Sequence, residues 1–134
     1  MNDRPTGVEL LRAVERFLEQ EVVPRLEGPR RYHARVAANL VAIVAREIET
    51  EEGQLRSEWE RLGGLLGLRE PAPALRADLR EAVSERTRAL AERIRRGDAD
   101  RGPWREELVR HLRRTVEDKL AVSRPPRFTP EESP

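Results

Sequence analysis

The chain has 134 residues and a net charge of +1, with 26 basic and 25 acidic side chains. This length predicts one domain, and the nearly balanced charges predict a mixed polar surface without a field for nucleic acid. The chain has no cysteine, which excludes disulfides, thiolate catalysis and cysteine metal sites. The N-terminal residues lack an apolar signal segment, and no apolar run is long enough for a membrane span, so we expect a cytoplasmic protein.

The first expected helix begins at a capping box formed by Thr6 and Glu9. The apolar residues that follow have helical spacing and are Leu10, Leu11, Val14, Phe17, Leu18, Val22 and Leu26. Pro24 removes a backbone donor and should kink or end this helix. Gly28 and Pro29 then break the chain before the next helix.

A second helix is expected from about residue 30 to about residue 52, and its many alanines would let a neighbouring helix approach closely. We therefore expect this helix to be the centre of a bundle. Gly53 could stop it or merely bend it. A third helix would hold the stripe of Leu55, Trp59, Leu62 and Leu66, with Gly67 as its cap.

A fourth helix is expected from near Pro73 to Ile94, and a fifth from Pro103 to about Leu120. No segment alternates with the period of two that indicates a strand. The sequence therefore predicts an all-α protein, an up-and-down bundle of four or five helices with short connections. Residues 1–123 would form this single domain, and residues 124–134 a proline-rich, extended or disordered tail.

Asn39 lies on an apolar side of the second expected helix, with Val36 and Ile43. A buried amide there would be satisfied within the protein and fix helix register, or would contact a ligand; we favour the structural role. Tyr32, His33 and Arg35 begin the same helix and could line a pocket with Asn39. Arg35 would suit a phosphate or a carboxylate. Lys119 and Arg4, from the chain ends, are candidates to close that pocket.

Other chemistry has weak support in the sequence. Glu47 and Glu51 are one turn apart, but no histidine has the spacing of a di-iron site, so we expect no metal and no cofactor. The glycine-rich segment at residues 63–67 lacks the lysine and the hydroxyl residue of a phosphate loop. Nucleic-acid binding is unsupported because acidic residues are interspersed with the arginines and aromatics make up only 4% of the chain. His111 is expected at the surface or its boundary.

Segments along most of the chain carry a resemblance to known sequences: Arg4-Pro5-Thr6, Glu9-Leu10-Leu11, Val14, Phe17-Leu18, Pro24, Leu26-Glu27-Gly28, His33 to Asn39, Thr115-Val116, Lys119-Leu120-Ala121-Val122 and Pro126-Arg127-Phe128. Together they resemble a family of small uncharacterised bacterial proteins, and the resemblance is densest from His33 to Asn39. The resemblance implies a protein without an assigned activity, encoded near acyl-CoA dehydrogenases and aminoglycoside-phosphotransferase-like kinases. Ser123-Arg124-Pro125 departs from the Asp-Asn or similar pair that the family usually has before its final proline.

Two functional hypotheses follow. The first is a non-enzymatic accessory protein that binds itself as a homodimer, or binds the kinase-like or acyl-CoA dehydrogenase neighbour that the resemblance implies. Trp59 and Trp104 would suit either a core or such an interface. The second is a small-ligand binding protein or an enzyme, with its pocket at Tyr32, His33, Arg35 and Asn39. No nucleophile has a diagnostic spacing, which makes the non-enzymatic hypothesis the leading one.

Overall fold

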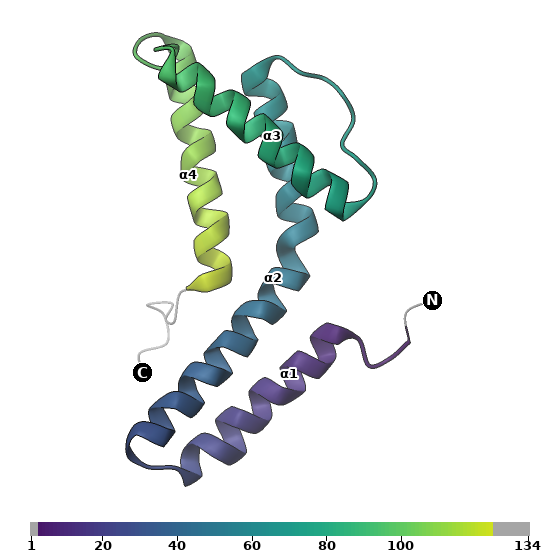
Figure 1. The fold of residues 1–134 in the computed structure, drawn as a ribbon, viewed down its shortest axis with the longest axis vertical. Coiled ribbons are helices and arrows are strands. Elements are labelled where there is room, and N and C mark those ends of the chain that lie inside the picture. Colours follow the sequence, from purple (N-terminus) through teal and green to yellow (C-terminus); the bar gives the residue numbers. More distant parts are fainter. Residues whose placement is uncertain (1–2, 125–134) are drawn as a thin grey trace, which may run out of the picture. The chain divides into compact units, whose positions relative to one another are not determined.

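The computed structural model describes residues 3–124, and within that range the chain is helical and contains no strand (Figure 1). It has four α-helices: α1 (Gly7–Phe17), α2 (Gly28–Leu66), α3 (Arg76–Arg95) and α4 (Pro103–Ser123). A π-helical turn (Leu18–Val22) and a 3-10 turn (Val23–Arg25) follow α1. The all-α prediction is confirmed. Of the expected tail at residues 124–134, residues 125–134 lie outside the described residues.

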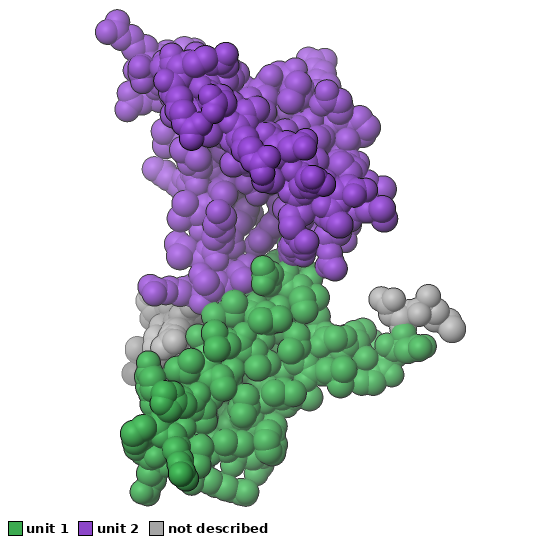
Figure 2. Space-filling model, viewed as in Figure 1, with its two compact units in different colours: residues 1–50 green, residues 51–134 purple. Residues whose placement is uncertain are grey.

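The chain divides into two compact units, Met1–Thr50 and Glu51–Pro134, coloured separately in Figure 2. We call them unit 1 and unit 2. Unit 1 contains α1 and the first part of α2. Unit 2 contains the rest of α2 with α3 and α4. The up-and-down order of the helices and the single domain over residues 1–123 stay predictions.

The start of unit 1 has the local structure that its sequence predicts. Thr6 accepts a hydrogen bond from the backbone N–H of Glu9, and the Glu9 carboxylate accepts one from the N–H of Thr6, which forms the expected capping box. Pro24 has no N–H to continue the α-helical ladder. Around it the chain widens into the π turn and then tightens into the 3-10 turn, which ends the helical segment as predicted.

The second and third expected helices are one continuous helix, α2, of 39 residues. Gly53 does not stop it, because a helical glycine costs only about 1 kcal/mol relative to alanine and the neighbouring turns retain their hydrogen bonds. The described part of the chain therefore has four α-helices and not five. The helix ends at Gly67, which has a φ of 68° and lets Leu68 donate its N–H to the carbonyl of Gly63 at 2.9 Å.

The core of unit 2 is formed by large apolar side chains from α2, α3 and α4. Its buried members are Trp59, Leu62, Leu65, Leu79, Val83, Leu90 and Leu108. Leu62 and Leu79 are completely buried, as the apolar spacing of their helices predicts. Helix α3 begins at Arg76 and not near Pro73, which leaves Leu75 exposed at its N-cap.

Arg86 of α3 is buried against the last turns of α2. Its guanidinium carbon lies 3.1 Å from the centre of the Trp59 ring, and its Nη1 donates to the Trp59 carbonyl at 3.0 Å. Its Nη2 bonds the Glu70 carboxylate at 2.8 Å. The charge of Arg86 is thus met by a carboxylate, a carbonyl and an aromatic face, which offsets the cost of burying it.

A second arginine–tryptophan pair binds the C-terminal end of α2. The Leu65 carbonyl accepts hydrogen bonds from Trp104 Nε1 at 3.0 Å and from Arg93 Nη1 at 2.9 Å. Arg93 also stacks on the Trp104 ring. This carbonyl lies in the last turn of α2, where it has no partner within its own helix, and a positive charge there is favoured by the helix dipole.

Alanine substitutions at Gly63 and Gly64, near the C-terminal end of α2, should have opposite effects on stability. A Cβ on Gly63 would lie 2.8 Å from Arg86 Nη1 and 2.9 Å from the Leu68 carbonyl oxygen, whereas a Cβ on Gly64 meets nothing within 4 Å. We expect Gly63→Ala to lower the free energy of unfolding by about 1–3 kcal/mol, because it overpacks this contact. Gly64→Ala should raise it by up to about 1 kcal/mol through helix propensity. Chemical denaturation of both variants checks this, and equal effects of the two substitutions would contradict the packing described.

Candidate functional site

The site residues predicted in the second helix all lie on α2 in unit 1. Tyr32, His33, Arg35 and Asn39 are exposed, and the Tyr32 and His33 rings meet edge to face at 5.6 Å. Within residues 3–124 neither Arg35 nor Asn39 forms an ion pair or a side-chain hydrogen bond. Asn39 is therefore not the buried, satisfied amide that we expected to fix helix register.

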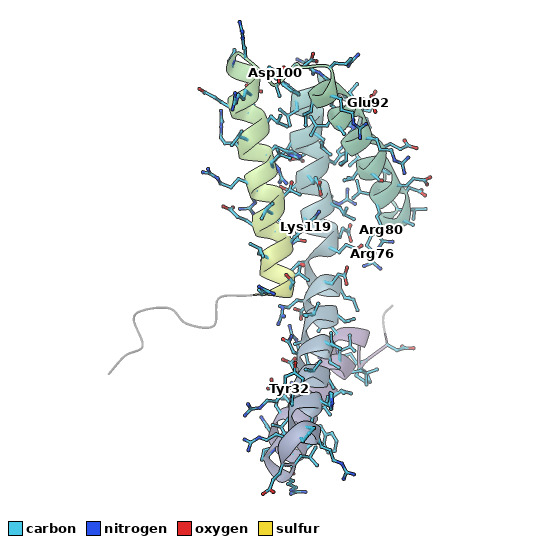
Figure 3. All side chains as sticks on the ribbon, turned by 60° about the vertical axis from the view of Figure 1, so that its left-hand side comes forward. Tyr32, Arg76, Arg80, Glu92, Asp100 and Lys119 are labelled. Atoms are coloured by element: carbon cyan, nitrogen blue, oxygen red, sulfur yellow. The ribbon has the colours of Figure 1, made fainter. Side chains whose placement is uncertain are left out.

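The two residues expected to close that pocket lie in different units. Arg4 is in unit 1, where its Nε lies 3.7 Å from the Glu9 carboxylate. Lys119 is on α4 in unit 2, and Figure 3 labels it together with Tyr32 on α2. A ligand site formed by these residues with Arg35 and Asn39 stays a prediction.

Helix α2 has apolar side chains on two opposite faces in unit 1. The buried face consists of alanines, with exposed fractions of 2% for Ala38, 5% for Ala42 and 0% for Ala45. Residues two apart in an α-helix point about 200° away from each other, so Val36, Leu40 and Val44 lie on the side opposite these alanines. Tyr32 and Ile48 continue the same spacing at either end. We call these residues the α2 stripe (Tyr32, Val36, Leu40, Val44 and Ile48), and all five are exposed.

Helix α1 has an unburied apolar stripe of its own. Leu10, Val14 and Phe17 recur at helical spacing and are 53%, 47% and 58% exposed. No residue of α1 is buried. The pairing of the two helices is supported by Arg12, which bonds both Glu15 of its own helix and Glu49 of α2. Large apolar side chains at this spacing normally face a packed neighbour, so both helices carry more apolar surface than unit 1 covers.

Charge is segregated along this part of α2. The first turns contain Arg30, Arg31 and Arg35 and no acidic residue, whereas residues 47–52 contain four glutamates. Within the described residues, Arg30, Arg31, Arg35 and Glu47 form no ion pair. Basic residues at a helix N-terminus oppose the helix dipole, so this distribution does not stabilise α2 by itself.

Unit 2 contains an open cavity of about 450 Å³ between α2 and α4. We call it the Arg61 pocket, and it is lined by Arg61, Gly64, Leu65, Glu107, Arg110, His111 and Arg114. Its residues were not predicted as a site. A pattern in the sequence could have indicated the pocket, because polar residues recur at helical spacing on both helices. They are Ser57 and Arg61 on α2, and His111, Thr115 and Asp118 on α4.

Arg61 is held in this pocket from several directions. Its guanidinium donates to Ser57 Oγ at 2.7 Å, to Thr115 Oγ1 at 3.4 Å and to His111 Nδ1 at 3.4 Å. Its Nη2 lies 3.7 Å from an Asp118 oxygen. Arg114 reaches the other oxygen of Asp118 at 3.2 Å. Bonds to two helices fix the direction of the Arg61 charge.

His111 is buried, with 5% of its surface exposed, and not at the surface or its boundary as expected. Burial lowers the pKa of His111 below its ordinary value of 6.5, and the Arg61 charge lowers it further. Because Nδ1 accepts the Arg61 hydrogen bond, the neutral ring carries its proton on Nε2.

Comparison with known proteins identifies the family. The sequence profile of a family described as a domain of unknown function, DUF6285, matches residues 24–127. The chain belongs to the DUF6285 family. No curated protein and no solved structure matches it. The DUF6285 match includes the α2 stripe and the Arg61 pocket, so both features lie inside the family's domain.

Among residues 3–124, no three histidine, aspartate or glutamate side chains are grouped so that they could hold a metal ion. No helix in this range is long and apolar enough to cross a membrane.

The lowered pKa of His111 predicts how stability depends on pH. Between the folded-state pKa and the ordinary value of 6.5, the unfolded chain binds more protons than the folded one. The free energy of unfolding should therefore be highest above pH 6.5 and should fall as the pH decreases below it. Replacing His111 with glutamine should flatten this part of the profile, measured by urea unfolding at several pH values.

The control for this experiment is His33→Gln, which removes the other histidine, an exposed one, from the chain. In this variant the free energy of unfolding should fall below pH 6.5 as it does in the parent protein. An equally large fall in the His111→Gln variant would show that groups other than His111 cause it.

Proposed function

We propose that this protein is a non-enzymatic interaction protein that assembles through the apolar surface of unit 1, with a second copy of the chain as its partner. The observation that carries the proposal is the α2 stripe, whose five large side chains are all exposed while small alanines occupy the buried face. A helix with apolar residues on opposite faces is typical of one that is covered on both.

The order of residues along the stripe supports pairing of two copies in antiparallel orientation. If Leu40 of one copy meets Leu40 of the other, Val36 lies opposite Val44, and Tyr32 lies at the same level along the pair as Ile48. An interface related by a two-fold axis requires such self-complementarity. The apolar residues are therefore placed symmetrically around Leu40 at intervals of one helical turn.

The charges support the same orientation. In antiparallel pairing, the end of the α2 stripe near Arg30 and Arg31 lies beside the other end of the stripe, near Glu47, of the second copy. A parallel pair would instead place like charges together, which is unfavourable. This arrangement also gives a reason for the basic N-terminal turn of α2, which opposes the dipole of its own helix. The net charge of +1 adds little repulsion between copies.

A kinase-like or acyl-CoA dehydrogenase enzyme is the second partner class, and it rests on the resemblance to a family encoded near such enzymes. Helix α1 offers its own apolar stripe of Leu10, Val14 and Phe17 for such a contact. Co-purification of the tagged chain with each enzyme tests this class. We expect one of the enzymes to be retained by the tagged chain, and we expect Phe17→Glu to abolish this retention. If neither enzyme is retained, this partner class is excluded.

The dimer predicts a strong effect of one charge at its centre. Leu40→Glu places two carboxylates against each other at the two-fold axis, so we expect the dissociation constant of the dimer to rise about 100-fold. Size-exclusion chromatography with light scattering, over a series of protein concentrations, measures this dissociation constant. Leu40 is 56% exposed in the single chain, so the variant should still fold.

The matched control is Leu75→Glu. Leu75 is 68% exposed, lies outside both stripes and occupies the N-cap of α3, where a negative charge is tolerated. This variant should dimerise like the parent. A parent chain that is monomeric at every concentration would overturn the proposal, as would equal weakening by the two substitutions.

Orientation is tested by reversing charges. Glu47→Arg should weaken the antiparallel dimer, and adding Arg30→Glu in the same chain should restore part of the affinity. The double variant restores opposite charges between copies only if Arg30 of one copy lies near residue 47 of the other. No recovery in the double variant would exclude the antiparallel arrangement.

A further inference from the structure

The Arg61 pocket combines features that the proposed assembly does not use. It lies wholly in unit 2, and its volume of about 450 Å³ is in the range of small-molecule sites. Leu65 and Gly64 supply apolar wall, and a Cβ on Gly64 would meet no atom within 4 Å. The pocket therefore has room for a molecule larger than an isolated ion.

Its lining carries a net positive charge, in a chain that is nearly neutral. Three arginines and one glutamate line it, which gives a local excess of two positive charges with His111 neutral. Asp118 neutralises part of this excess, because it pairs with Arg114 and lies near Arg61. Arg110 forms no ion pair within the described residues, although Glu107 lines the same pocket.

The three cations differ in how they are held. Arg61 is fixed by hydrogen bonds to α2 and α4, and Arg114 by one carboxylate. Arg110 is exposed and available. A fixed guanidinium beside a free one is an arrangement suited to an oxyanion, since each presents paired N–H donors that match phosphate or carboxylate oxygens.

We propose that the Arg61 pocket binds the phosphate or carboxylate group of a small metabolite, with Arg110 and Arg61 as its charged contacts. His111 supplies a neutral N–H donor at the wall of the pocket, and Leu65 contacts the uncharged part of the ligand. This assigns an anion site to residues of α2 and α4 and is independent of the apolar stripes of unit 1.

The test is a titration of the isotopically labelled full chain with inorganic phosphate, and separately with succinate, at constant ionic strength. The expected result is saturable shifts in the side-chain NMR signals of Arg61 and His111 with at least one of the two anions. A bound anion should also raise the pKa of His111 towards 6.5, because its charge opposes that of Arg61. Sodium chloride at matched ionic strength should give neither effect.

Arg110→Gln should weaken binding about tenfold, the usual effect of losing one charge-assisted hydrogen bond. The control is Arg113→Gln, which makes the same change in net charge on the neighbouring exposed surface outside the pocket lining. Gly64→Leu should also weaken binding, since it adds bulk at the cavity wall, where a Cβ meets no atom within 4 Å. Shifts that do not saturate with either anion would overturn the proposal, and so would equal losses in the Arg110 and Arg113 variants.

Discussion

The structure depends on a long helix that carries apolar surface on more sides than one neighbour can cover. In unit 1, the alanines at positions 38, 42 and 45 allow close packing on one face of α2. The larger side chains at positions 36, 40 and 44 lie away from that face. Full burial of an exposed side chain of this size is worth about 1.5–3 kcal/mol, so part of that gain per residue is available to the dimer that we propose.

In unit 2, helix α2 is held by polar contacts as well as by apolar packing. Its last turns are bound by polar contacts, with Arg86 stacked on Trp59 and the Leu65 carbonyl shared by Arg93 and Trp104. Such contacts have directional requirements that apolar packing lacks. They fix the end of α2, and the Leu65 whose carbonyl they use also lines the Arg61 pocket. The α2 residues that line the proposed anion site therefore lie in a segment that these contacts hold in place.

Sequence patterns predicted local features well where the cause is local. The capping box at Thr6, the disruption at Pro24 and the stop at Gly67 depend on backbone chemistry within a few residues. The core of unit 2 also followed from apolar spacing, as with Leu62 and Leu79. These predictions needed no knowledge of which helices become neighbours.

The errors concern which face of a helix is covered. Asn39 was expected to be buried because it shares a face with large apolar residues, but the alanines form the covered face and Asn39 is exposed. His111, which lies beside Arg110 and Leu112 in the sequence, was expected at the surface or its boundary, yet its ring is buried and bonds Arg61 of α2. Both outcomes depend on tertiary pairing, which one sequence does not encode as a local pattern.

Cross-linking tests the central claim, that the α2 stripe pairs with itself in antiparallel orientation. The chain has no cysteine, so Val36→Cys and Val44→Cys each introduce a single thiol. Oxidation of the two variants mixed together should produce a disulfide between residues 36 and 44 of different copies, because these positions face each other. Each variant oxidised alone should cross-link poorly. Efficient cross-linking of the Val36→Cys variant with itself, or none in the mixture, would contradict the account.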